Sequence, residues 1–143
     1  MSLFSAIAVG ASGMAAQRAR AEVLVENLAN AETTRTPEGG PYRRKDVVFE
    51  TSPVAEEFSS IFASQLGAGG VAVAGVVTDN SEPERRYMPG HPDADPDGYV
   101  AFPRVNPAED MVDLMGASRG YEANVAAISA VKDMIQRSIG LLQ

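Results

Sequence analysis

The last third of the chain carries apolar residues at a strict spacing of seven. These residues are Leu114, Tyr121, Ile128, Ile135 and Leu142. Four further apolar residues widen the same stripe: Val125, Val131, Met134 and Ile139. The pattern predicts one long helix with a single apolar face. Because a seven-residue repeat falls short of two full helical turns, the stripe drifts around a straight helix and favours a left-handed supercoil with a partner.

The beginning of this helix is marked by Asn106, a good N-cap residue, followed by Pro107, which suits the first helical position. No proline follows Pro107. At 1.5 Å per residue, some 35 residues make a rod of roughly 50 Å. A rod of that length needs an equally long surface to pack against.

The start of the chain repeats the pattern, and we expect a helix from about Leu3 to Asn30. Its apolar face consists of Leu3, Ile7, Met14, Ala21, Leu24 and Leu28. Glycines and alanines in this segment allow another backbone to approach closely. We expect the first and last helices to pair and to bundle with further copies. The alternative is an ordinary two-helix hairpin inside a monomer, which leaves much alanine-rich surface without neighbours.

All nine prolines fall between Pro37 and Pro107, so the middle of the chain differs from both ends. Here we expect four strands at residues 47–49, 71–78, 85–88 and 99–102. We also expect Ser52 and Pro53 to cap a short helix that reaches Leu66. The basic residues Arg43, Arg44 and Lys45 suggest either an anion or wall-polymer contact or a solvated strand edge, and the second is favoured.

Together these patterns predict an α+β fold, in which long N- and C-terminal helices pair as a coiled coil and a small antiparallel β unit lies between them. We divide the chain into three parts. Residues 1–34 form the first helical part, residues 35–105 the irregular β-rich middle, and residues 106–143 the second helical part. Within the middle, residues 51–70 are a linker or a short helix.

Composition and charge argue against several classes of protein. The net charge of -7 opposes binding to nucleic acid, whose phosphates repel an acidic surface. The chain has no cysteine, so it has neither a disulfide framework nor a thiolate metal site. No segment is apolar over enough residues to embed in a membrane, and the first residues do not resemble a cleavable signal peptide.

The clearest candidate for a ligand-binding site is one acidic turn. Asp93, Asp95, Asp97 and Gly98 match the opening of a calcium-binding EF-hand loop. The twelfth position of such a loop needs a glutamate, and here it is Arg104. We therefore favour a structural turn and keep a calcium-regulated binding module as the alternative function. The single histidine and the scattered carboxylates form no catalytic set, and we expect no enzyme, no cofactor and no small-molecule substrate.

Several motifs resemble those of the bacterial flagellar rod and hook protein family. Residues 27–34 (NLANAETT) resemble the end of its N-terminal helix, and residues 36–45 (TPEGGPYRRK) resemble its proximal rod members. The turn at residues 89–100 and the segment 105–124, which ends in ASRGYEAN, fit the same group. The departure lies at residues 52–70, which look longer than the usual linker.

The resemblance implies a structural subunit of the proximal rod, which crosses the periplasm and transmits torque for motility. It implies export through the flagellar export apparatus without a cleaved signal peptide. It implies assembly with copies of itself, with proximal and distal rod subunits and with a rod-base adaptor. The expected assembly interface comprises Leu3, Ile7, Met14, Leu24, Asn27, Leu28, Asn30, Leu114, Tyr121, Asn124, Val125, Ile128, Val131, Ile135, Ile139 and Leu142.

Overall fold

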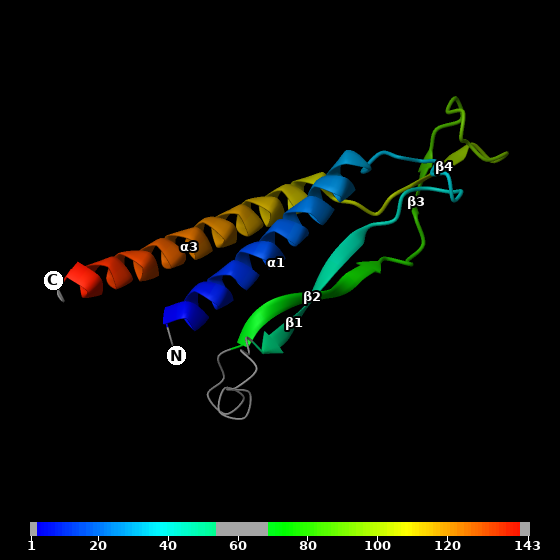
Figure 1. Ribbon diagram of the computed structural model, residues 1–143. Helices are drawn as coiled ribbons and strands as arrows, with labels where there is room; N and C mark the ends of the chain where they lie inside the picture. The colour runs from blue at the N-terminus through cyan, green and yellow to red at the C-terminus, as the bar shows by residue number, and fades with distance from the viewer. Residues whose placement is uncertain (1–2, 54–68, 141–143) are drawn as a thin grey trace.

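Two long helices lie side by side along one edge of the molecule (Figure 1). The computed structural model describes residues 3–53 and 69–140. Helix α1 spans Leu3–Ala29 and helix α3 spans Pro107–Gly140. They run antiparallel, because Gly10 faces Ile128 while Gly120 faces Gln17. The predicted fold class, with paired terminal helices and antiparallel strands between them, is confirmed.

Local chemistry sets the helix ends close to where the sequence predicts them. At the start of α3 the side-chain oxygen of Asn106 accepts a hydrogen bond from Ala108 N–H at 3.2 Å. At the end of α1 the Asn30 side chain donates to the carbonyl of Glu26, and Thr33 donates to Asn30. These bonds turn the chain away from the helix axis and toward the strands.

The first two strands form a two-stranded antiparallel ribbon beside α1 (Figure 1). Strand β1 spans Lys45–Pro53 and strand β2 spans Gly69–Thr78. Their register shifts at a bulge between Val48 and Phe49. The prediction that Ser52 and Pro53 cap a helix is wrong, since both continue β1 opposite Gly70 and Gly69. The rest of that predicted helix lies outside the described residues.

The other two strands form a separate ribbon at the far end of the molecule (Figure 1). Strand β3 spans Glu84–Tyr87 and strand β4 spans Tyr99–Phe102. Its inner face carries Val100 and Phe102, which are buried at 1% and 8% exposure. The β-rich middle is therefore two small sheets and not one.

Helix α1 is the central element of the molecule. It packs against α3 and also against both strands of the β1–β2 ribbon, whereas α3, among the described elements, packs on α1 alone. Among residues 3–53 and 69–140, the buried apolar residues are few: Ala16, Leu24, Tyr42, Val100, Phe102 and Ala117. A core this small leaves much of the apolar surface of the helices uncovered.

Candidate assembly surfaces

The contact between α1 and α3 follows the predicted heptads in part. On α3 the buried or half-buried positions recur every three or four residues, with Asp113 beside Leu114 as an addition. They are Asp110, Asp113, Leu114, Ala117, Gly120, Asn124, Ile128, Val131 and Ile135. Leu114, Ile128 and Ile135 belong to the predicted stripe, so the structure supports this part of the pairing. The pattern missed Asp110 and Ala117, because neither a carboxylate nor an alanine stands out in a search for large apolar residues.

Glycines bring the two backbones close together in this seam. A Cβ atom on Gly13 would lie 2.9 Å from the side-chain nitrogen of Asn124, and one on Gly10 would lie 2.9 Å from Ile128. Across the seam, a Cβ on Gly120 would meet Gln17 at 3.2 Å. A side chain at Gly10 or Gly13 would displace Ile128 or Asn124, and one at Gly120 would push Gln17 aside.

The remaining residues of the expected interface are divided between covered and open surface. Leu24 and Asn27 are buried, and Ile7, Met14, Leu28 and Asn30 are half-buried. Three residues stay exposed: Tyr121 at 42%, Val125 at 41% and Ile139 at 55%. Leu142 and the side chain of Leu3 lie outside what the structure describes. The exposed parts of the Tyr121, Val125 and Ile139 side chains are open to contact with a neighbour.

Asn27 fastens the end of α1 to the start of β1. Its side-chain nitrogen donates to the carbonyl of Lys45 at 2.8 Å, and its side-chain oxygen accepts from Lys45 N–H at 2.9 Å. The same oxygen accepts from the Tyr42 hydroxyl at 2.9 Å. Burial, together with the nearby Glu26 and Asp110 carboxylates, raises the pKa of Tyr42 to about 12, so this hydroxyl keeps its proton. The Asn27 amide thus bonds to both backbone groups of Lys45, as a residue on a neighbouring strand would.

A buried ion pair joins the same junction to the start of α3. The Asp110 side chain has no exposed surface, and its carboxylate lies 3.1 Å from the Arg44 guanidinium. Burial raises the pKa of Asp110; Arg44 opposes this, and the carboxylates of Asp46, Asp113 and Glu109 add to it. Sequence reasoning missed this pair, because the two residues are far apart in the chain and nothing local links them.

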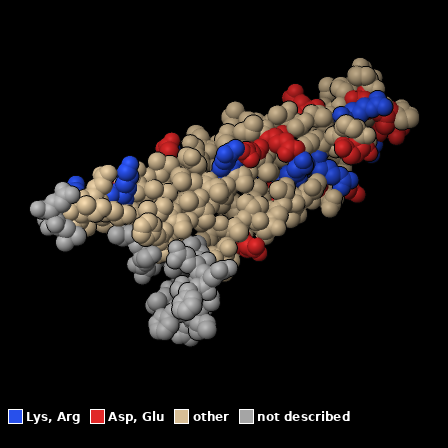
Figure 2. Space-filling view, in the orientation of Figure 1, with Lys and Arg blue, Asp and Glu red and all other residues tan. Residues whose placement is uncertain are grey.

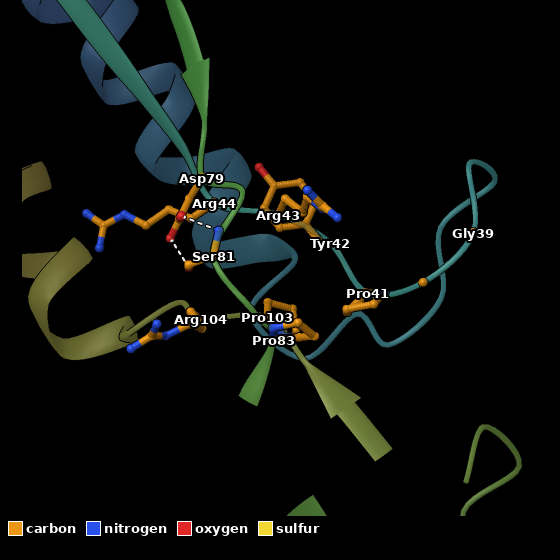
Figure 3. A pocket seen from close by; sticks show the side chains of 11 residues that line it. Gly39, Pro41, Tyr42, Arg43, Arg44, Asp79, Ser81, Pro83, Pro103 and Arg104 are labelled. Atoms are coloured by element: carbon orange, nitrogen blue, oxygen red, sulfur yellow. Dashed lines mark hydrogen bonds between the residues drawn. The ribbon is translucent and has the colours of Figure 1, made fainter. Parts of the chain in front are cut away.

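The basic cluster is occupied by protein partners. Besides the Arg44–Asp110 pair, Arg43 donates to Asn80 at 2.7 Å, and Lys45 pairs with Glu26 at 2.5 Å. A cavity of about 90 Å³ lies beside the cluster, with Pro41, Pro83 and Pro103 in its wall (Figure 3). The favoured interpretation as a solvated strand edge fits Arg43, which is exposed, but not Arg44, whose side chain is 22% exposed and pairs with the buried Asp110.

The acidic turn is held by hydrogen bonds within itself and by one from the loop that follows α1. The Asp93 carboxylate accepts a hydrogen bond from Thr34 at 2.8 Å, while Asp95 accepts from the N–H groups of Asp97 and Tyr99. The bond from Tyr99, chiefly, lowers the pKa of Asp95. The Nδ1 atom of His91 accepts from Asp93 N–H, as expected of a turn residue. Within the described residues, no three acidic or histidine side chains converge as metal ligands.

One end of the molecule is free of charge over long stretches. Residues 3–17 of α1, 123–131 of α3 and 69–77 of β2 contain no Asp, Glu, Lys, Arg or His. Yet Phe4 is 75% exposed, and the alanines of α3 beyond the seam are exposed as well. Figure 2 shows charged side chains mainly toward the opposite end, which carries β3 and β4. None of the described helices has a stretch apolar enough to cross a membrane.

Comparison with known proteins gives matches at both ends and along the whole chain. Residues 7–35 match the family described as flagella basal body rod protein, and residues 97–141 match the C-terminal family of the flagellar basal body rod FlgEFG proteins. The chain is 42% identical to the flagellar basal-body rod protein FlgC of Borreliella burgdorferi, over 100% of this chain and 99% of that protein. It is 43% identical to FlgC of Bacillus subtilis, over 97% of each chain. It is 38% identical to FlgC of Salmonella typhimurium over the full length of both.

Proposed function

Because this chain belongs to the FlgC family of flagellar basal-body rod proteins, we propose that it forms the proximal part of the rod and transmits torque through its packed terminal helices. It is a structural subunit of the flagellar basal-body rod and assembles with other rod proteins. The finer proposal concerns which surfaces bear the load and which partners they meet.

The uncharged stretches of α1 and α3, residues 3–17 and 123–131, are the observation that carries this proposal. A helix that is apolar or small all round is normally buried on every side. Here α1 and α3 cover only one face of each other, and Val125 and Ile139 remain 41% and 55% exposed. Exposed apolar surface of this kind marks a site of contact with another protein. We place the assembly interface on this end, with Tyr121, Val125 and Ile139 in direct contact with neighbours.

The half-buried seam has a different part in the same proposal. Leu114, Ile128 and Ile135 hold α3 on α1, so that each subunit enters the rod as a preformed pair of helices. Dense contacts between small and apolar side chains resist deformation, because closely packed interiors have low compressibility. The partners in this proposal are further copies of the chain, proximal and distal rod subunits and a rod-base adaptor, with delivery by the flagellar export apparatus.

We include the absence of catalysis in the proposal. It is supported by the way the candidate groups are used, since Asp95 and His91 bond within their own turn and the Asp93 carboxylate accepts a hydrogen bond from Thr34. It is also supported by the family, whose members are named as rod proteins. No observation favours the calcium-regulated module over the structural role.

A charge placed on the outer surface of α3 tests the assembly proposal. Ala126 is exposed and lies in the uncharged stretch, on the side of α3 away from Asn124 and Ile128. We expect Ala126→Glu to abolish swimming and rod formation in cells that lack their own copy of the subunit, because a buried unpaired carboxylate opposes subunit contact. The isolated variant should keep the helix content of the parent chain, as measured by circular dichroism.

The matched control is Ser118→Glu, which adds the same charge at an exposed position of α3 outside the uncharged stretch. This variant should swim normally. Normal swimming of the Ala126→Glu cells, at wild-type levels of the protein, would show that this end of α3 is not buried in the rod.

A further inference from the structure

Both ends of α3 carry exposed apolar residues. Near the start of the helix, Met111 is 54% exposed, Val112 is 62% exposed and Met115 is 53% exposed. Near its end, Met134 is 51% exposed and Ile139 is 55% exposed. Exposed apolar residues that cluster in this way mark sites of contact with another protein.

The residues near the start of α3 form one surface. Successive residues of a helix are about 100° apart, so Met111, Val112 and Met115 lie within an arc of about 100°. The centre of this arc is roughly opposite the seam residues Asp110 and Ala117, which are buried against the rest of the chain. The start surface (Met111, Val112 and Met115) therefore points away from α1.

The end of α3 reaches past the beginning of α1 (Figure 1). Gly10 of α1 faces Ile128 of α3, and the helices run antiparallel, so Leu3 is level with about residue 135. Ile139 continues the seam side of α3 one turn after Ile135, but none of the residues described for α1 is level with it. The seam thus leaves the last turn of α3 without a helix beside it.

The charged residues near the two ends of α3 favour contact between unlike ends. Glu109 is exposed near the start and forms no ion pair with any described residue. Near the end, Lys132 and Arg137 are exposed and are likewise unpaired within residues 3–53 and 69–140, with one carboxylate, Asp133, close in sequence. Two starts would bring like charges together, as would two ends, whereas a start and an end bring opposite charges together.

We propose that the end of α3 in one copy of the chain, at Met134 and Ile139, packs on the start surface of α3 in a second copy. In this contact Arg137 of one copy lies beside Glu109 of the other. The apolar residues supply the buried area, and the charges set which ends meet. This inference rests on the proposed assembly function and names one contact that the assembly uses.

The symmetry of this contact fits an open assembly. Met111 and Ile139 are separated by 28 residues of helix, a distance of about 42 Å, so one copy cannot join its own two ends. Every copy that uses one end still offers the other. Contacts of this head-to-tail kind generate rings or open helical filaments instead of closed dimers.

Two cysteines in one chain test the contact, because the chain contains no cysteine of its own. The chain with both Met111→Cys and Ile139→Cys replaces the subunit in cells, and a short thiol-reactive cross-linker is added. We expect a ladder of covalent multimers, because each copy joins one neighbour at each end. Each single variant should give no ladder. The control chain carries Glu122→Cys with Ile139→Cys, since Glu122 is exposed on the same side of α3 as Met111 but about 16 Å further along.

Charge reversal tests the same contact independently. In the chain with Met111→Cys and Ile139→Cys, Glu109→Arg alone or Arg137→Glu alone should lower the yield of multimers about two- to fivefold, because like charges then meet. The two reversals together should restore the yield, because opposite charges meet again between copies. Within one chain the two reversals cannot compensate, since each opposes the dipole of its own helix. Restoration therefore reports a contact between copies.

The outcomes separate this inference from the proposed function. A ladder that is absent from the control chain and is restored by the double reversal supports the contact. An equal ladder from the control chain would overturn it. Swimming cells that give no ladder would show that a different rod protein covers these ends, which overturns the inference and leaves the assembly function standing. Cells in which the cysteine-free parent chain fails to restore swimming would overturn both.

Discussion

At the scale of single residues, Asn27 and Asp110 hold three elements together at one junction. Asn27 satisfies both backbone groups of Lys45, and Asp110 pairs with Arg44 just before β1. The two residues differ in how well their buried polar atoms are paired. The Asn27 amide has partners for both its nitrogen and its oxygen, whereas Asp110 has lost all contact with water in exchange for one ion pair. A buried charge of this kind is retained at an energetic cost.

This cost predicts the pH dependence of stability. The pKa of Asp110 is raised in the folded chain, so the folded chain keeps this proton to a higher pH than the unfolded chain does. The free energy of unfolding should therefore fall as the pH rises from about 4 through the raised pKa. We expect Asp110→Asn to remove this decline. Urea unfolding at a series of pH values between about 4 and about 7 measures it.

Asp95 provides a control of opposite sign. Hydrogen bonds, chiefly from Tyr99 N–H, lower the pKa of Asp95, so its contribution is present at neutral pH and is lost as the pH falls. The Asp95→Asn variant should lose less stability than the parent chain on acidification. If the parent and Asp110→Asn chains give parallel curves over the whole range, Asp110 does not titrate as the structure implies.

At the scale of elements, the α1–α3 seam depends on small residues as much as on large ones. Gly10, Gly13 and Gly120 allow close approach, and Ala117 is 1% exposed at the centre of the contact. Asn124 fills the space above Gly13 and donates to the carbonyl of Gly120 at 2.9 Å. This polar residue in the seam favours one alignment of the helices over shifted ones.

Identical substitutions at two glycines should therefore have opposite effects. Gly13→Leu places side-chain atoms where Asn124 lies, and overpacking of this kind lowers the free energy of unfolding by about 1–3 kcal/mol. At Gly116, on α3, an added Cβ meets nothing within 4 Å. There Gly116→Leu should raise the free energy of unfolding by up to about 1 kcal/mol through helix propensity. Chemical unfolding measures both, and a stabilised Gly13→Leu chain would contradict the close seam.

The elements also show what the sequence can and cannot predict. Periodicity located both helices and the residues Leu114, Ile128 and Ile135, because large apolar side chains at a seven-residue spacing are typical of packed helices. It missed Asp110 and the role of Arg44, because an ion pair between distant segments leaves no local pattern. The Ser-Pro dipeptide predicted a helix cap, but pairing with Gly69 and Gly70 extends β1 through Pro53. Here tertiary contact overrides local preference.

At the scale of the whole molecule, charge and apolar surface are separated. The net charge of -7 lies mostly outside the uncharged end of α1 and α3 (Figure 2). Subunits with this distribution repel one another over distance and attract one another only when the apolar ends meet. The chain thus has a physical reason to stay dispersed at low concentration and to associate in a crowded assembly.

Salt and temperature should therefore change association in a defined way. Raising the salt from about 50 mM to about 500 mM screens the repulsion and should strengthen association of the purified chain. Cooling from about 25 °C to about 4 °C weakens apolar burial and should reduce it. Sedimentation over a range of protein concentrations measures both trends. Association that weakens with salt would instead indicate contacts dominated by opposite charges.

The two places where the ribbon is fastened to α1 have a mechanical consequence. Ser12 bonds to Val71 near one end of the ribbon, and Asn27 bonds to Lys45 at the other. Fifteen residues of helix separate these points, a distance of about 22 Å. A ribbon bonded to the helix at one point could pivot about that point, whereas a ribbon bonded at two separate points keeps its orientation relative to the helix. When α1 rotates with the rod, the ribbon should therefore rotate with it. Any neighbouring subunit that contacts the ribbon would receive the same rotation.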